Sequence, residues 1–300
     1  MWHQYLHHIG QGDIKALARC ISLIENEVIG YEELLQILPA SGKPIIGITG
    51  PPGAGKSTLT NALITQLTDG NKKVAGLCID PSSPFNLGAL LGDRIRMSSW
   101  YNNPHVFIRS LATRGSLGGL HPKIIEISDL LKAAPFAYII IETVGAGQTE
   151  IEIAGLADTT IVVVVPEAGD EVQTMKAGLM EIADIFVVNK ADRPDADLFV
   201  RNLRLMPAPA FHKKDIPIPV IKTIAPQKKG IAELHEAIMA HINLHQVNDK
   251  RFWLLAEKTY FLLQQKRMKG ISKKEIKKQV EPAGIGFNLY KFVEEFQVST

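Results

Sequence analysis

The clearest chemistry in the sequence belongs to a glycine-rich stretch, Gly50-Pro51-Pro52-Gly53-Ala54-Gly55-Lys56-Ser57. The stretch matches the phosphate-loop pattern G-x-x-x-x-G-K-[ST] at every fixed position. Glycines let backbone N–H groups turn towards a phosphate, and the N-terminus of the following helix adds partial positive charge. Lys56 can reach the β- and γ-phosphates, and the Ser57 hydroxyl can ligate Mg²⁺. Together with Thr58, these residues predict a triphosphate site; a turn that only joins strand to helix is the alternative reading.

A second motif, Asn189-Lys190-Ala191-Asp192, follows an apolar strand pattern far behind the phosphate loop. The Asp192 carboxylate can accept hydrogen bonds from the ring N–H and the exocyclic amine of guanine, whereas adenine offers no such pair of donors. The stem of Lys190 can pack along the base, and Asn189 can tie the loop together. The motif therefore predicts GTP and GDP as ligands; a polar turn with a helix cap is the alternative.

Acidic residues at strand ends predict support for a metal ion. Glu142 ends a strand, and Asp80 ends another, with Asp93 downstream of it. Carboxylates beside a triphosphate require a divalent cation to balance the negative charge, so we expect Asp80, Asp93 and Glu142 around Mg²⁺, directly or through water. Gly145 can present its N–H to the γ-phosphate, and Gln148 is a candidate for positioning water or for switching. A structural capping role is the alternative for Glu142.

Several arginines are candidates for stabilising the negative charge of the transferred phosphoryl group. The phosphoryl group gathers negative charge during transfer, and a nearby guanidinium would stabilise it. For any single arginine, a surface salt bridge is the alternative role. The candidates are Arg94, Arg96, Arg109 and Arg114.

Composition limits the class of protein. The chain has 300 residues with 33 Lys and Arg against 31 Asp and Glu, so its net charge of +2 gives no electrostatic case for nucleic acid or a membrane surface. Cys20 and Cys78 form no C-x-x-C pair and have the pattern of buried residues, which favours a reducing compartment. We see no signal peptide, and the apolar run 161–165 is too short to span a bilayer, so we expect a cytoplasmic protein.

Apolar runs alternating with helical patterns predict the fold. Strands are expected over 44–49, 74–80, 106–110, 137–142, 159–165, 184–188 and 218–223. Helices are expected over 55–68, 121–132, 149–156, 171–182, 195–205 and 230–243. Several strands are apolar at successive positions, which is typical of a parallel sheet covered on both faces. We therefore predict a doubly wound α/β fold of mostly parallel strands, with ligands at the carboxyl ends of the strands.

Helical segments flank this core. Residues from Gly12 to about Leu38 read as helical, and so does the chain after about residue 246. We divide the sequence into an N-terminal helical extension at 1–42, a nucleotide-binding domain at 43–246 and a C-terminal helical extension at 247–300. Aromatic residues near the C-terminus suit core or dimer contacts, so the last segment is a candidate dimerisation element.

Together these motifs resemble the methylmalonyl-CoA mutase-associated GTPase chaperones, a family formerly labelled arginine/ornithine transport ATPases. The resemblance covers roughly residues 12–245. The stretch 107–119 is the most specific part of it, because that stretch has no general role in nucleotide hydrolysis. The stretches that carry the resemblance are 12–19, 50–58, 80–84, 88–97, 107–119, 142–150 and 189–192.

The resemblance implies a SIMIBI-type phosphate-loop GTPase, a class related to signal-recognition-particle and metal-insertase proteins. Such proteins form homodimers and bind a cobalamin-dependent acyl-CoA mutase. They gate the loading of adenosylcobalamin into the mutase or protect it from inactivation. By matching positions, Gln148 would lie in a mobile switch, and the guanine loop would be formed by Thr223, Ile224 and Ala225, where Lys222-Thr223-Ile224-Ala225 stands in place of the family's Ser-Ala pattern.

Three other functions remain open. A nickel-type metal-delivery GTPase would require a Cys/His cluster. A nucleotide-driven transport accessory protein or kinase would bind ATP, against the guanine motif. A binding module that has lost hydrolysis would not need Lys56, Ser57 and Glu142 together.

Overall fold

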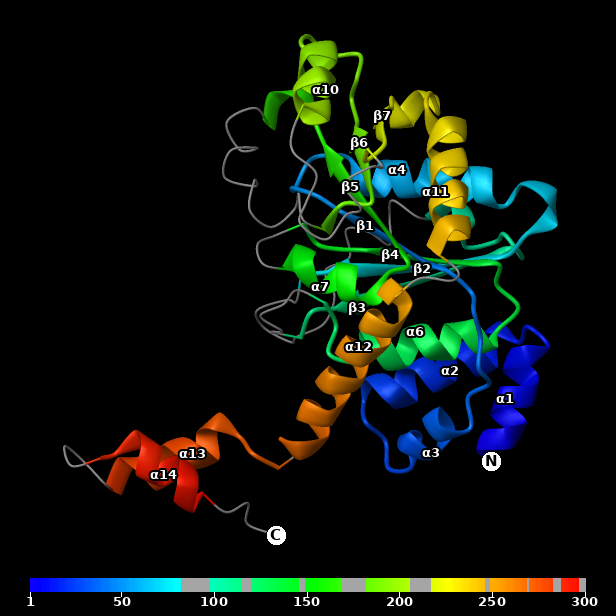
Figure 1. The fold of residues 1–300 in the computed structure, drawn as a ribbon. Helices are drawn as coiled ribbons and strands as arrows, with labels where there is room; N and C mark the ends of the chain where they lie inside the picture. The colour runs from blue at the N-terminus through cyan, green and yellow to red at the C-terminus, as the bar shows by residue number, and fades with distance from the viewer. Residues whose placement is uncertain are drawn as a thin grey trace. The chain divides into compact units, whose positions relative to one another are not determined.

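The protein is described here from a computed structural model (Figure 1). The structure describes residues 1–81, 98–114, 120–145, 149–168, 182–205, 217–245, 249–268, 270–282 and 287–296. The chain divides into two compact units, Met1–Arg251 and Phe252–Thr300, and each is described by itself.

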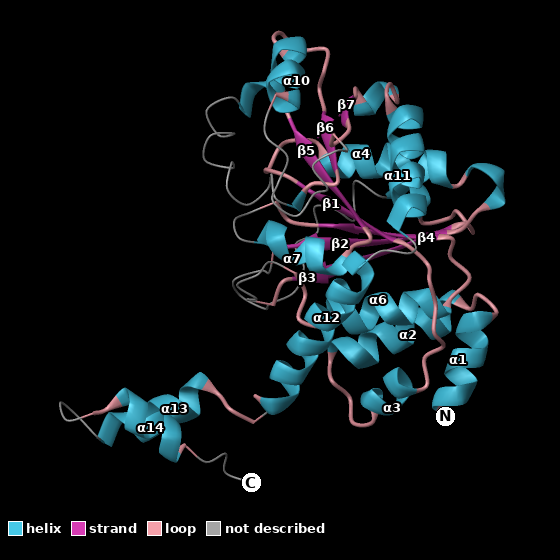
Figure 2. Cartoon of the chain, viewed as in Figure 1, coloured by secondary structure: helices cyan, strands magenta, loops and turns pink. Residues whose placement is uncertain are grey.

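The first unit is built on one seven-stranded parallel sheet (Figure 2). The strand order is β3-β2-β4-β1-β5-β6-β7, so β1 lies at the centre. All seven expected strands are present, as is the parallel arrangement. The strands are β1 (Ile45–Thr49), β2 (Val74–Asp80), β3 (Val106–Ala112), β4 (Tyr138–Glu142), β5 (Thr159–Val164), β6 (Ile185–Val188) and β7 (Val220–Lys222).

Helices cover both faces of the sheet, which confirms the doubly wound α/β prediction (Figure 1). One core cluster joins α4 and α11 to the sheet, and another joins α10 to β5, β6 and β7. The helices that follow the strands of the sheet are α4 (Lys56–Leu67), α6 (Ile124–Ala133), α7 (Thr149–Leu156), α10 (Ala196–Arg204) and α11 (Ile231–His245). The helix expected over 171–182 lies outside the described residues up to position 181.

The N-terminal region is helical, as the sequence predicts. The segment from Gly12 to about Leu38 contains two helices, α2 (Ile14–Glu25) and α3 (Tyr31–Gln36), and α1 (Trp2–Gly10) precedes them. The chain turns between α2 and α3 because Glu27 and Gly30 have φ values of 48° and 90°, which no helix accommodates. The Asp13 carboxylate caps α2 by accepting from the N–H groups of Lys15 at 2.9 Å and Ala16 at 3.0 Å.

The second unit is helical, as the sequence predicts. Its helices are α12 (Asp249–Arg267), which begins just before the unit does, α13 (Lys273–Val280) and α14 (Leu289–Glu295). The Phe292 ring lies 5.3 Å from that of Phe287 and 5.5 Å from that of Phe296. Of the helices that the structure describes, none combines the length and the apolar character needed to cross a bilayer.

Both cysteines are buried, as expected from their patterns, and they form no disulfide with each other. Cys20 lies on α2 and Cys78 on β2. Burial raises the pKa of the Cys20 thiol to about 11, so this thiol stays protonated at neutral pH.

The packing of α7 on the central strand generates a stability prediction. A Cβ on Gly47 of β1 would lie 2.7 Å from Ile153 Cγ1 and 2.9 Å from Ala157 Cβ, closer than carbon atoms pack. We expect Gly47→Ala to lower the free energy of unfolding by about 1–3 kcal/mol, because α7 must shift. Gly76→Ala is the matched control, since its Cβ would meet Ile108 at an ordinary 3.6 Å. Urea denaturation measures both; equal stability of the two variants would contradict the packing argument.

Candidate functional site

The glycine-rich loop between β1 and α4 is packed too closely for side chains at its fixed glycines. Gly50 has φ +136°, and a Cβ there would lie 2.0 Å from the Val163 carbonyl oxygen. Gly55 has φ +89°, and a Cβ there would lie 2.4 Å from Asn189 Nδ2. Both positions therefore require glycine for space and for backbone conformation. The loop has the shape that the phosphate-loop motif predicts.

Lys56 is buried at the start of α4, and its ammonium group stays within the loop. Nζ donates to the carbonyl oxygens of Gly50 at 2.8 Å and Pro51 at 3.1 Å. A Cβ on Gly145 would lie 2.2 Å from this Nζ, so the backbone after β4 comes directly to the lysine. The structure thus brings together the two residues that the sequence assigns to the γ-phosphate.

Glu142, at the end of β4, is held by two hydroxyl groups from α4. Ser57 Oγ donates to its Oε1 at 2.6 Å, and Thr60 Oγ1 donates to its Oε2 at 2.8 Å. The carboxylate is 4% exposed. This geometry places the Glu142 carboxylate beside Ser57, as the predicted metal site requires. Thr60 was not predicted, although its place one helical turn after Lys56 is a signal that could have identified it.

Asp80 brings a second carboxylate to the same edge of the sheet. Cys78 of β2 is in register with Glu142 of β4, and Asp80 follows two residues later at 4% exposure. Hydroxyl and carboxylate oxygens are the ligands that Mg²⁺ prefers, and Mg²⁺ also takes phosphate oxygens and water. The donor set of Ser57, Asp80 and Glu142 therefore fits Mg²⁺.

Asn189 joins the phosphate loop to the predicted guanine loop. Its Nδ2 donates to the Ala54 carbonyl at 2.9 Å. Its Oδ1 accepts from Thr223 Oγ1 at 3.0 Å and from the Ala225 N–H at 3.2 Å. Lys190 Nζ reaches the Gly53 carbonyl at 2.8 Å. The structure therefore assembles the motifs at 50–57, 189–192 and 223–225 into one site.

The predicted guanine contact has two parts, Asp192 and residues 223–225, and they differ in their surroundings. Asp192 is exposed in the loop after β6, where a base could reach its carboxylate. The Thr223 hydroxyl is bonded to Asn189, and the Ile224 N–H donates to the Lys229 carbonyl. The Ala225 N–H is also bonded to Asn189, so the contact of residues 223–225 with a base stays a prediction from the sequence. Asp93, Gln148, Arg94 and Arg96 lie outside the described residues.

The other two candidate arginines bind the N-terminal helix α2. Arg109 Nη2 lies 2.5 Å from Glu25 Oε2 and 3.1 Å from Ser22 Oγ. Arg114 Nη1 donates to the Glu25 carbonyl at 2.6 Å. These contacts favour the salt-bridge alternative over phosphoryl stabilisation for Arg109, and they place Arg114 as a cationic cap on the C-terminus of α2.

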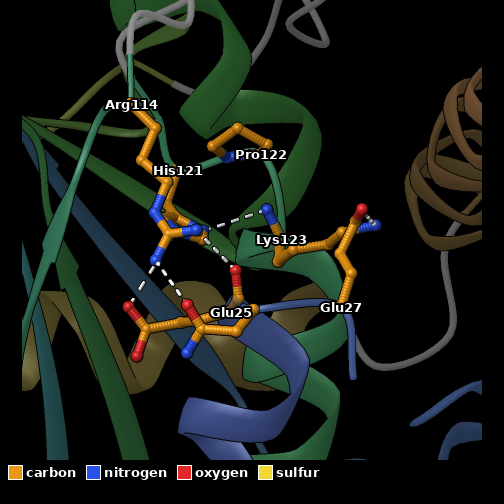
Figure 3. Close-up of a pocket in the computed structure, with 7 residues that line it drawn as sticks. Glu25, Glu27, Arg114, His121, Pro122 and Lys123 are labelled. Carbon is orange, nitrogen blue, oxygen red and sulfur yellow. Dashed lines mark hydrogen bonds and ion pairs between the residues drawn. The ribbon is translucent and has the colours of Figure 1, made fainter. Parts of the chain in front are cut away.

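Arg114 borders a cavity of about 330 Å³. Its other lining residues include His121, whose Nδ1 accepts the Lys123 N–H at 3.0 Å, so that Nε2 carries the proton of the neutral ring. Burial first, and then the neighbouring cations, lower the pKa of His121 to about 4. Lys123 Nζ lies 2.7 Å from Glu27 Oε1 and 3.3 Å from Glu126 Oε1. The charged groups pair with one another, so the cavity belongs to a junction between the N-terminal helices and the core (Figure 3).

Comparison with known proteins gives consistent results. The model of the family described as "Methylmalonyl Co-A mutase-associated GTPase MeaB" matches residues 17–279. A Pyrococcus abyssi protein with a provisional GTPase name is 48% identical over 246 residues, which cover 80% of this chain and 76% of that protein. The fused isobutyryl-CoA mutase of Geobacillus kaustophilus is 37% identical over 255 residues, covering 79% of this chain and 23% of that protein.

A solved structure supports the fold. The crystal structure of a LAO/AO transport system kinase superimposes with a TM-score of 0.70 and 23% sequence identity. The superposition covers 98% of this chain and 95% of that one.

The bonds of Asn189 generate a prediction. Asn189→Ala removes the partner of the Ala54 carbonyl and of the Ala225 N–H in a buried position. We expect the affinity for GDP to fall at least about tenfold, because buried polar groups lose their hydrogen bonds and the two loops separate. Isothermal titration calorimetry measures this affinity. Asn202→Ala, at an exposed site on α10, is the control; an equal response of the two variants would show that Asn189 does not organise the site.

Proposed function

Because the chain belongs to the methylmalonyl-CoA mutase-associated GTPase family and is a GTPase, we propose that it acts with Mg²⁺ as a chaperone of a cobalamin-dependent acyl-CoA mutase. In this role it gates the loading of adenosylcobalamin and protects the mutase. Methylmalonyl-CoA mutase is the client that the family name indicates. The observation that carries the nucleotide part is the bonding of Asn189 to both the phosphate loop and the guanine loop.

In this proposal each residue of the site has its own role in nucleotide binding. On GTP binding, Lys56 Nζ exchanges the Gly50 and Pro51 carbonyls for phosphate oxygens, which carry more negative charge. Ser57, Asp80 and Glu142 would hold Mg²⁺, which neutralises charge on the β- and γ-phosphates when bound. Gly145 presents its backbone N–H at the γ-phosphate. The roles proposed for Asp93 and Gln148 rest on the sequence.

The mutase part of the proposal rests on the relatives. In the Geobacillus protein, a region similar to this chain makes up 23% of a polypeptide that is named as a fused mutase. Fusion keeps two activities together, so the same partnership between separate chains is the natural proposal here. The chaperone role itself extends the family description.

We further propose a homodimer formed by the C-terminal unit. Large apolar side chains are exposed along its helices, and such surfaces typically mark an interaction site. The exposed fractions range from 41% to 82% for Phe252, Leu255, Tyr260, Phe261, Leu263, Leu289, Tyr290 and Val293. A cytoplasmic location fits two cysteines that are not joined in a disulfide, and it remains part of the proposal.

The described residues favour no rival function. Among them, no group of three or more His, Cys, Asp and Glu residues is arranged to hold a metal ion, as a metal-delivery GTPase would require. An ATP-dependent transport accessory protein or kinase would not explain the guanine motif. Ser57 hydrogen-bonded to Glu142, beside Lys56, is the arrangement expected of a working hydrolase rather than of a binding module.

The guanine assignment yields a prediction. Asp192→Asn replaces one acceptor oxygen by a donor, which opposes the two N–H donors of guanine. We expect the preference for GDP over ADP to fall about 100-fold or more. Competition binding measures the ratio, with Asp195→Asn in the same loop as the matched control. Unchanged discrimination in the Asp192 variant would reject the assignment.

The client assignment is tested by direct binding. We expect a purified cobalamin-dependent acyl-CoA mutase from the same organism to co-elute with this protein in a non-hydrolysable GTP analogue. The Lys56→Ala variant should not co-elute with the mutase in the presence of the nucleotide, because the variant lacks the charge that holds the phosphates. Size-exclusion chromatography with light scattering reports both this complex and the homodimer. A protein that hydrolyses GTP yet never binds the mutase would remove the chaperone proposal and leave the GTPase intact.

A further inference from the structure

Thr60 on α4 makes a contact that no nucleotide-binding motif includes. Its hydroxyl lies 2.8 Å from Glu142 Oε2, while Ser57 Oγ holds Glu142 Oε1 at 2.6 Å. Ser57 and Thr60 are three residues apart, so both hydroxyls project from the same face of the helix. Two hydroxyls of one helix therefore hold both oxygens of one carboxylate.

The Thr60 proton has two possible acceptors. Oγ1 also lies 2.9 Å from the Lys56 carbonyl oxygen, but a hydroxyl has one proton to donate. The ionised carboxylate is the stronger acceptor, so the proton is directed to Glu142. Thr65 provides a comparison on the same helix, since its hydroxyl donates to the Asn61 carbonyl at 3.1 Å.

Because Thr60 and Glu142 are buried, the loss of their hydrogen bond would be difficult to compensate. Thr60 is 1% exposed and Glu142 is 4% exposed, so water has little access to replace a lost bond. A glutamate side chain has three rotatable bonds, and each hydrogen bond to its carboxylate restricts their rotation. The bond from Thr60, together with that from Ser57, restrains the plane of the carboxylate.

We propose that Thr60 is a positioning residue for the magnesium site. It acts through Glu142 by holding the carboxylate in the orientation that serves Ser57. Carboxylates that support a metal ion are themselves commonly hydrogen-bonded, and loss of such a partner weakens metal binding 10–100-fold in typical cases. The inference rests on the proposed Mg²⁺ dependence of nucleotide binding.

The test measures how Mg²⁺ strengthens the binding of a fluorescent GDP analogue. Thr60→Val keeps the shape and volume of the side chain and removes the hydroxyl. We expect this variant to need about tenfold more Mg²⁺ for the half-maximal effect. In EDTA its affinity for the analogue should match that of the wild type, because no contact with the nucleotide is lost. Thr60→Ser retains a hydroxyl and should recover most of the Mg²⁺ response.

Controls separate this role from a general effect on α4. Thr65→Val removes a hydroxyl from the same helix and should leave the Mg²⁺ response unchanged. In a Glu142→Gln background, Thr60→Val should add little, because its partner is already altered. Circular dichroism establishes that each variant is folded.

Two outcomes contradict the inference in distinct ways. If folded Thr60→Val shows the wild-type Mg²⁺ midpoint, Thr60 does not position Glu142, and the GTPase site stands without it. If the wild-type protein binds GDP equally well with Mg²⁺ and with EDTA, the proposed magnesium site is itself wrong and the inference fails with it.

Discussion

The site depends on backbone segments that approach one another more closely than any side chain permits. Hypothetical Cβ atoms on Gly50, Gly55 and Gly145 would lie 2.0–2.4 Å from atoms of neighbouring segments. These three glycines come from the loop after β1 and the end of β4, and their contacts extend to β5 and the loop after β6. The parallel sheet brings its carboxyl ends to one edge, and the missing side chains let those ends close around a phosphate.

The charged groups in this small volume are hydrogen-bonded to neutral groups of the protein. Lys56 is surrounded by loop carbonyls, and Glu142 accepts from the hydroxyls of Ser57 and Thr60. A buried ion without partners would be costly, so both groups are held ready by neutral polar atoms. The proposed binding of phosphate and Mg²⁺ would replace these neutral partners by full charges of the opposite sign. In that proposal the site is formed in advance while remaining open to its ligands.

Much of the fold could be predicted because buried parallel strands produce apolar runs that stand out in the sequence. The seven strands and the motifs at 50–57 and 189–192 follow from local pattern. Features that depend on contacts between distant segments could not be predicted in this way. The turn at Glu27 and Gly30, the use of Arg109 and Arg114 by α2, and the bond from Thr60 to Glu142 all depend on three-dimensional neighbours.

The junction between α2 and the core limits how far the N-terminus of this protein can be truncated. Arg109 and His121 have Glu25 as an acidic neighbour, and Lys123 has Glu27 in the first thirty residues in addition to Glu126 on α6. A protein trimmed to begin at residue 43 would keep the whole sheet and the nucleotide motifs, yet it would expose the face of α6 that packs on α2 and would remove Glu25 from Arg109 and Glu27 from Lys123. The smallest unit able to fold alone therefore extends well upstream of the nucleotide-binding motifs.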